Sequence, residues 1–231
     1  VMGDPDDPEV QVQSIVFRYG LTTSFPGDVR REIDRGSFAV SEDEIGSRTD
    51  LRPLPIVTID GEQARDFDDA VYVRKTNDHY ELLVSIADVA HYVRPATALD
   101  QEAYSRGTSV YFPDRAIPML PEALSNGICS LNPNEDRLTK SVAMEINGKG
   151  EVIRSRFFNS VIRSQERMTY TSVRKILVDK DPECLARYRN LVDQFKLMEE
   201  LARLIYESRR GRGNLDFDLP EAEIILDIQG A

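Results

Sequence analysis

Four aspartates within ten residues constrain this chain more than any other feature of its sequence. They are Asp60, Asp66, Asp68 and Asp69, and the last three lie in the string Arg65-Asp66-Phe67-Asp68-Asp69-Ala70. Neighbouring carboxylates repel each other by roughly 1 kcal/mol in water and several times more at a lower dielectric constant. A partly buried cluster must therefore hold protons, pair with arginines or bind divalent cations. Oxygen ligands alone select a hard cation, so we expect Mg2+, with Mn2+ able to substitute.

The flanking segments predict how the four side chains meet. Residues 54–60 are apolar and β-branched, which predicts a strand that ends at Asp60. A polar loop follows, and residues 70–74 begin a second strand. Side chains alternate along an extended segment, so Asp69 would point away from Asp66 and Asp68. An irregular turn is therefore required if all four carboxylates are to meet at one site.

Three other interpretations of the cluster can be weighed from the sequence. The first is an acidic surface turn paired with Arg65 and Arg74, and it stays open. The second is a calcium-binding loop starting at Asp66, which needs Gly at its sixth position and Glu at its twelfth; this chain has neither there. The third is a phosphatase of the Asp-x-Asp-x-Thr/Val type, but Ala70 occupies the position that needs Thr or Val. The sequence argues against the second and third.

Composition limits the class of protein. The chain has 231 residues, of which 41% are hydrophobic and 30% charged, and it can bury a core in one large or two small domains. No apolar stretch approaches the ~20 residues of a membrane span, so we expect a cytoplasmic protein that does not contact a membrane. The net charge of −11 counts against a nucleic-acid partner without excluding one. Two cysteines and two histidines argue against a disulfide framework and a zinc site.

Turn signals and apolar periodicity predict a mixed α+β fold, with a largely antiparallel sheet and helices packed on one face. The expected elements are hairpins 70–75/80–87 and 138–146/151–162, the second around Asn147-Gly148, a brief helix at 28–33, a helix from Thr97 to Gly107, a short helix at 121–127 and a long helix from Asp181 to Gly211. Residue His91 is expected in a strand or at a strand end as a structural histidine.

Several motifs make the chain resemble the ribonuclease II and ribonuclease R family, the exoribonucleases built on the RNB catalytic domain. These motifs are Asp60-Gly61 with residues 66–70, then residues 85–93, 109–113, 117–121 and 124–133, and Asp136-Arg137. Their combination is more similar to the ribonuclease R branch. The resemblance implies hydrolysis of single-stranded RNA from its 3′ end to nucleoside 5′-monophosphates, with Mg2+ at the aspartates and no obligate protein partner.

The resemblance also implies a domain division. Residues 1–10 are similar to the tail of a cold-shock-type OB domain, residues 11–50 connect it to the catalytic domain, and residues 51–231 are similar to the N-terminal part of that domain. The family's domain continues past residue 231 with further active-site residues. We therefore expect a fragment with an incomplete site, and we doubt turnover by this chain alone.

Roles for particular residues follow from the resemblance. Asp60, Asp66, Asp68 and Asp69 match the metal-binding aspartates, and Asp68 is the residue whose loss is expected to abolish cleavage while sparing RNA binding. Tyr111 and Phe217 match aromatic clamps on the RNA, and Tyr170 matches an aromatic near the terminal nucleotide; each could instead be a core aromatic. A further set, Arg209, Arg210 and Arg212, is expected either to contact RNA or to complement a helix dipole.

Two alternatives to an active nuclease stay open. One is an RNB-like domain that binds RNA or a protein partner without cutting. Inactive relatives would be expected to lack an aspartate, and here all four are present. The other is an acidic interaction module whose cluster is merely solvated, which would make the matches at Tyr111 and Phe217 coincidental.

Overall fold

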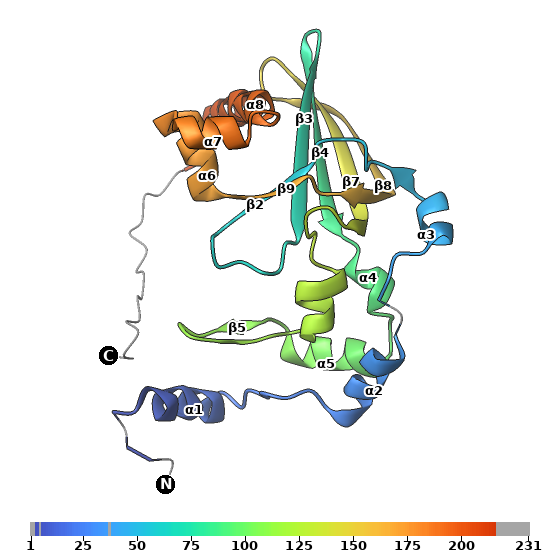
Figure 1. Cartoon of the computed structure of the whole chain (residues 1–231), viewed down its shortest axis with the longest axis vertical. Helices are drawn as coiled ribbons and strands as arrows, with labels where there is room; N and C mark the ends of the chain where they lie inside the picture. Colours follow the sequence, from blue (N-terminus) through green and yellow to red (C-terminus); the bar gives the residue numbers. More distant parts are fainter. Residues whose placement is uncertain (1–2, 5, 37, 216–231) are drawn as a thin grey trace. The chain divides into compact units, whose positions relative to one another are not determined.

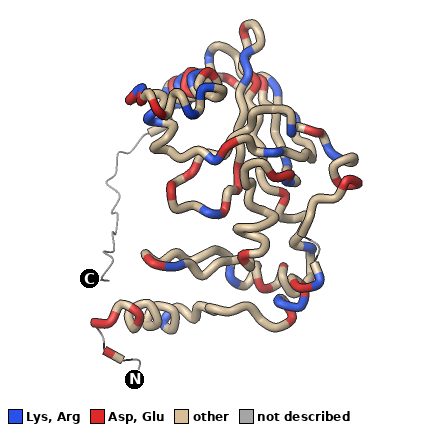
Figure 2. The backbone as a smooth tube through the Cα atoms, in the orientation of Figure 1, with Lys and Arg blue, Asp and Glu red and all other residues tan. Residues whose placement is uncertain are grey.

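The protein divides into two compact units in a computed structural model that describes residues 3–4, 6–36 and 38–215 (Figure 1). Among the described residues, the first unit comprises the chain up to Phe38 together with Ala90–Ser125, and the second comprises Ala39–Val89 and residues 126–215. Acidic and basic residues are interspersed along both units (Figure 2). None of the helices in the described ranges is both long enough and apolar enough to cross a membrane.

The second unit is built on a single sheet. Its strands are β1 (Thr49–Asp50), β2 (Val57–Asp60), β3 (Asp69–Thr76), β4 (His79–Ala87), β7 (Asp136–Asn147), β8 (Val152–Arg163) and β9 (Glu166–Thr169). Their order across the sheet is β1-β8-β7-β4-β3-β2-β9. The pairs β1–β8 and β2–β9 are parallel, and the other neighbouring strands are antiparallel. The prediction of a mixed, largely antiparallel sheet is confirmed.

Helices cover one face of this sheet and loops cover the other. The helices of the unit are α3 (Glu42–Gly46), α6 (Tyr170–Arg174), the wide turn η2 (Lys175–Asp179), α7 (Pro182–Arg187) and α8 (Val192–Gly211). Val73 of β3 packs in one cluster with Leu201 of α8. Ala70 lies three residues from Val73 in β3, so its side chain points to the opposite face of the sheet. It packs there with Phe67 and Leu131 from loops. The expectation of helices on one face is therefore confirmed.

The prediction of one helix from Asp181 to Gly211 is wrong, because the chain breaks it into α7 and α8. The Asp181 carboxylate caps α7 as expected, accepting from the Cys184 N–H at 2.8 Å. Residues 188–191 then form a tight turn, in which Leu191 N–H donates to the Tyr188 carbonyl at 2.8 Å. This turn lets residues of both helices pack around Phe195, which is fully buried.

The hairpin of β7 and β8 was predicted from Asn147-Gly148, but its loop is longer than that signal implies. Residues 148–151 connect the strands, and the Asn147 side-chain oxygen accepts from the N–H groups of Lys149 and Glu151 at 2.9 and 3.0 Å. Gly150 takes a φ of +74°, and a Cβ there would lie 2.3 Å from the Leu204 carbonyl oxygen of α8. Position 150 therefore requires glycine both for its backbone conformation and for the close approach of α8.

The first unit contains short helices and a small hairpin. Its elements are α1 (Pro8–Arg18), α2 (Gly27–Arg35), α4 (Val89–Tyr92, which begins in the second unit), α5 (Ala98–Arg106), β5 (Val110–Tyr111), β6 (Ala116–Ile117) and the wide turn η1 (Ala123–Ile128), which ends in the second unit. The Thr97 hydroxyl caps α5 as expected, and the N–H of the buried Leu99 donates to Glu32 of α2 at 3.0 Å. His91, expected in a strand or at a strand end, lies in α4, where its ring meets that of Tyr92 edge-on with 4.9 Å between the ring centroids.

Two phenylalanines of the second unit test whether the cluster under α8 carries the stability of the fold. Phe195 has no exposed surface, whereas Phe157 on β8 is 79% exposed. We expect Phe195→Ala to lower the free energy of unfolding by about 3–5 kcal/mol, since it leaves a cavity. Phe157→Ala should change it by less than about 0.5 kcal/mol. Urea unfolding followed by circular dichroism measures both, and equal losses would contradict this account of the core.

Candidate functional site

Strand pairing brings the two ends of the aspartate segment together. β2 and β3 are antiparallel, with Val57 opposite Val71. The carboxyl end of β2 at Asp60 and the amino end of β3 at Asp69 therefore lie at the same edge of this pair. Residues 61–68 connect them without regular secondary structure. This is the irregular turn that the alternation argument required.

The charges of neighbouring aspartates affect the ionisation of two of the four carboxyl groups, those of Asp60 and Asp68. Burial raises the pKa of Asp68, and the charges of Asp66, Asp69 and Asp60 raise it further. Burial also raises the pKa of Asp60, with Asp69 and Asp66 adding to the effect, while Arg167 and the Gly61 N–H oppose it. Like charges and partial desolvation both disfavour the ionised form. A bound cation would remove this penalty.

The donor chemistry of the cluster fits a magnesium ion that is bound partly by other ligands. Within the described residues, no three His, Cys, Asp or Glu side chains lie close enough together to share one metal ion. A closed protein cage of the kind that calcium and zinc use is thus absent from that part of the chain. Mg2+ is commonly bound by one or two carboxylates, with water and substrate phosphates completing its shell. The aspartates provide ligands of that type.

A buried serine holds the middle of the aspartate segment in place. The Ser130 hydroxyl donates to the Arg65 carbonyl at 3.0 Å and accepts from the Phe67 N–H at 3.0 Å. These two bonds bracket Asp66. On the other side of Phe67, the Asp68 carbonyl accepts from the Ala87 N–H at 2.9 Å. The backbone on both sides of the Phe67 ring, which is 4% exposed, is therefore fixed.

Arg137 in turn fixes the segment that carries Ser130. Its guanidinium donates from Nε to the Ser130 carbonyl at 2.7 Å and from Nη2 to the Gly127 carbonyl at 3.3 Å. The neighbouring Cys129 is buried, and that burial raises the pKa of its thiol to about 12, with the charge of Asp68 adding to the shift. The roles of Ser130 and Arg137 are not predictable from the sequence. Both lie in motifs that resemble the ribonuclease II and ribonuclease R family, but spacing alone does not reveal which carbonyl a side chain will reach.

The predicted aromatic contacts are in different parts of the chain. Tyr111 ends β5 in the first unit and is 68% exposed. Tyr170 begins α6 in the second unit and is 63% exposed. Neither is a core aromatic, so both can present a ring to a ligand. Phe217 lies outside the described residues, and the RNA-binding roles of all three stay predictions.

The arginines at the end of α8 lie away from the aspartates. Arg209 and Arg210 occupy the last turn of the helix, and Arg212 is its C-cap. The preceding part of α8, through Leu201 and Ile205, packs on Tyr80, which pairs with Lys75 near the end of β3 opposite to Asp69. Cations in this position complement the helix dipole. Contact with RNA at the aspartate site therefore gains no support from their position and stays a prediction.

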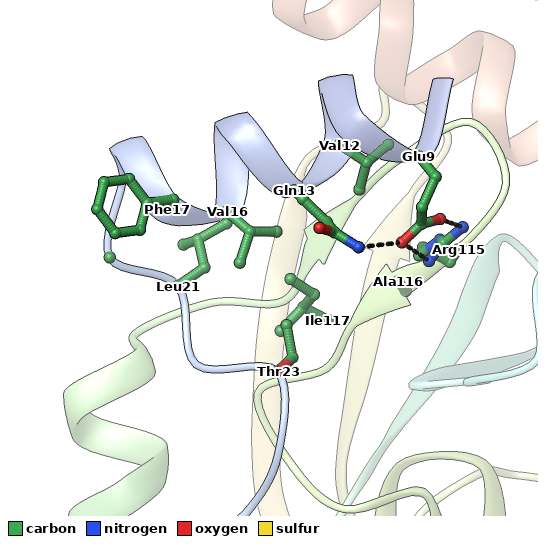
Figure 3. Close-up of a pocket in the computed structure, with 11 residues that line it drawn as sticks. Glu9, Val12, Gln13, Val16, Phe17, Leu21, Thr23, Arg115, Ala116 and Ile117 are labelled. Carbon is green, nitrogen blue, oxygen red and sulfur yellow. Dashed lines mark hydrogen bonds and ion pairs between the residues drawn. The ribbon is translucent and has the colours of Figure 1, made fainter. Parts of the chain in front are cut away.

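A pocket of about 790 Å3 in the first unit contains none of the predicted site residues (Figure 3). Val12 and Val16 of α1 face Ile117 of β6 across it, and Glu9 forms an ion pair with Arg115 at one end at 2.6 Å. Its lining is largely aliphatic and carries no group of catalytic residues.

Comparison with known proteins places this site in a family. Residues 48–231 match the RNB domain. The chain therefore belongs to the RNB domain family. It is similar to ribonuclease R of Thermotoga maritima, with 47% identity over 234 residues that cover 100% of this chain and 33% of that protein. Ribonuclease R of Escherichia coli is 42% identical over 230 residues, covering 99% of this chain and 28% of that protein.

Solved structures agree with this placement. Mycoplasma genitalium RNase R in complex with double-stranded RNA matches with a TM-score of 0.90 and 31% identity, covering 100% of this chain and 40% of that one. Yeast Ssd1, described as a pseudonuclease, matches with a TM-score of 0.73 but 18% identity, which shows a shared fold alone. The resemblance to ribonuclease R that the motifs predicted is confirmed. The chain spans about a third of the length of the curated relatives.

Removal of the Ser130 hydroxyl tests the bracket around Asp66. Ser130→Ala leaves the Arg65 carbonyl and the Phe67 N–H without this partner. We expect a loss of about 1–3 kcal/mol in the free energy of unfolding, the usual cost of unpaired buried groups. Ser155→Ala on the exposed part of β8 is the control and should stay within about 0.5 kcal/mol of wild type. Identical urea midpoints for the two variants would contradict a stabilising role for the two Ser130 hydrogen bonds on either side of Asp66.

Proposed function

We propose that the protein is a 3′-to-5′ hydrolytic exoribonuclease that degrades single-stranded RNA to nucleoside 5′-monophosphates, and that this chain supplies the metal-binding aspartates. The observation that supports this most is the raised pKa of Asp60 and of Asp68, to which burial and the charges of the neighbouring aspartates contribute. Membership of the RNB domain family and similarity to ribonuclease R add to it.

The chemistry of the reaction explains why carboxylates are needed. Divalent ions bound here would lower the pKa of the attacking water and neutralise the charge that develops on the leaving 3′ oxygen. We assign Asp60, Asp66 and Asp69 to holding Mg2+, with Mn2+ as a substitute. Asp68 also belongs to this set and is our candidate for the catalytic residue, since it is the carboxylate whose ionisation the other three all affect.

The RNA itself would be held largely by side chains outside the cluster. Sequence-independent binding of single strands relies on bases stacked on aromatic rings. We propose Tyr111, Tyr170 and Phe217 for this role, and the first two are exposed enough to serve. The related Mycoplasma genitalium enzyme has been solved with RNA bound. Since this chain spans a third of its relatives' length, we propose that the remaining site residues lie in the rest of the polypeptide and that the full-length protein works in the cytoplasm.

A second function is favoured by one observation. The fold is shared with a pseudonuclease, so the architecture alone does not establish cutting. In this alternative the domain binds RNA or a protein partner without hydrolysis. The presence of all four aspartates in the sequence weighs against it. The fate of RNA bound to the full-length protein distinguishes the two.

An aspartate-to-asparagine change tests the proposed activity. Asp68→Asn keeps the shape of the side chain and removes its charge. In the full-length protein with Mg2+, we expect hydrolysis of a 5′-labelled oligoribonucleotide to fall by at least about 100-fold, as when a group that stabilises developing charge is lost. The Kd for the RNA should stay within about threefold, since aromatic stacking is untouched.

The control for this experiment is Asp78→Asn, in the exposed turn between β3 and β4, which should behave as wild type. RNA that is bound but not shortened by the wild-type protein would favour the non-catalytic alternative. Shortening that survives Asp68→Asn would remove Asp68 from its catalytic role.

A matched pair of tyrosines tests the aromatic contact. Tyr111 and Tyr104 belong to the same unit and are 68% and 90% exposed. We expect Tyr111→Ala to weaken binding of single-stranded RNA by about 1–3 kcal/mol, the usual effect of one lost stacking platform. Tyr104→Ala should leave the Kd unchanged. Fluorescence anisotropy with the catalytically silent Asp68→Asn background measures both, and equal affinities would exclude Tyr111 from the RNA path.

A further inference from the structure

An arginine from a distant strand reaches into the loop between β2 and β3. Arg167 lies on β9, which pairs in parallel with β2 and places it opposite Thr58. Its Nη2 group donates to the carbonyls of Gly61, Glu62 and Ala64, at 3.2, 2.7 and 3.2 Å. One side chain therefore gathers three backbone carbonyls of the segment that separates Asp60 from the other aspartates.

The same guanidinium also contacts the far end of that segment. It lies over the ring of Phe67, with 5.1 Å between the guanidinium carbon and the ring centroid. Phe67 is 4% exposed and sits between Asp66 and Asp68. The Nε group of Arg167 is buried without a hydrogen-bond partner in the described residues. The carbonyl bonds and the stacking on Phe67 are thus the contacts that hold the guanidinium, and through it the loop.

We propose that Arg167 is the positioning residue of the aspartate cluster, setting the placement of Asp60 relative to Asp66 and Asp68 so that carboxylates from both ends of the loop can contribute ligands to a cation. This rests on the proposed function. The hydrogen bonds that Arg167 donates go to the loop backbone, to the carbonyls of residues 61, 62 and 64. Its charge nevertheless opposes the rise in the pKa of Asp60.

The planar guanidinium is what this role requires. A lysine ammonium carries the same charge, but it has no flat surface to stack on Phe67. It therefore cannot combine that stacking with hydrogen bonds to the three loop carbonyls. The matched variants are therefore Arg167→Lys, which keeps the charge, and Arg167→Met, which keeps only an apolar stem. The control is Arg163→Lys, whose partner is Asp136 at 2.8 Å and which does not touch the loop.

The test uses the full-length protein and has two readouts. Mn2+ affinity is measured by electron paramagnetic resonance without RNA, and kcat and KM are measured on single-stranded RNA with Mg2+. We expect Arg167→Lys and Arg167→Met to weaken Mn2+ binding at least tenfold and to lower kcat at least tenfold, with KM for RNA within twofold. Arg163→Lys should match wild type in all three quantities. Thermal unfolding followed by circular dichroism identifies any variant that fails to fold. If Arg167→Met does not fold, the measurements on Arg167→Lys decide the test.

The outcomes separate this proposal from the proposed function. Wild-type Mn2+ affinity and kcat in Arg167→Lys would overturn the positioning role while leaving the exonuclease intact. A rise in KM with unchanged kcat and Mn2+ affinity would also overturn it, because Arg167 would then act on RNA binding. A wild-type protein that neither binds Mn2+ nor shortens RNA would overturn the proposed function, and the positioning role with it.

Discussion

The mutual repulsion of four carboxylates is the constraint on which the architecture of the second unit depends. Left to itself, a loop carrying this charge would spread into solvent, where the aspartates could separate. In the fold, partial burial and the charges of neighbouring aspartates instead raise the pKa of Asp60 and of Asp68. That arrangement is tenable because the loop backbone is bonded to groups outside it. The stability of the sheet and its loops therefore opposes the repulsion within the site.

The order of the strands in the sheet places these bonding groups beside the loop. Parallel pairing of β9 with β2 brings Arg167 beside the loop, and antiparallel pairing of β3 with β4 brings Ala87 to the Asp68 carbonyl. The Ser130 hydroxyl also donates to the Arg65 carbonyl of the loop, and Arg137 in turn donates to the Ser130 carbonyl. The contacts of Arg167, Ala87 and Ser130 are to the loop backbone and hold it in place.

The sequence predicted the parts of this fold that depend on local signals. Period-two alternation and turn residues located the hairpins, and Thr97 and Asp181 were recognised as helix caps. Local signals did not predict the features that depend on contacts between residues far apart in the chain. The long helix breaks because two helices share one cluster around Phe195, and the glycine that the β7–β8 loop requires is Gly150, owing to α8, rather than Gly148.

The candidate site likewise combines residues that local sequence signals reveal with residues that only distant contacts define. The aspartates were evident because their charge is visible in the sequence itself. Ser130 and Arg167 could not be predicted, because nothing in their own neighbourhood indicates the carbonyls they bond. Whether a tyrosine such as Tyr111 is exposed depends likewise on the finished fold, which the sequence pattern left open between core and surface.

The distance along the chain between the loop and its anchors has a consequence for biosynthesis. Ser130 is 65 residues beyond the carbonyl it bonds, and Arg167 is 106 residues beyond Gly61. At roughly 5–20 residues per second, translation would deliver Arg167 about 5–20 seconds after the aspartate loop. During that interval the nascent chain exposes four clustered negative charges with no fixed geometry. The loop backbone therefore gains its bonds to Ser130 and Arg167 late, and the aspartate segment lacks its anchor from β9 until that strand has been made.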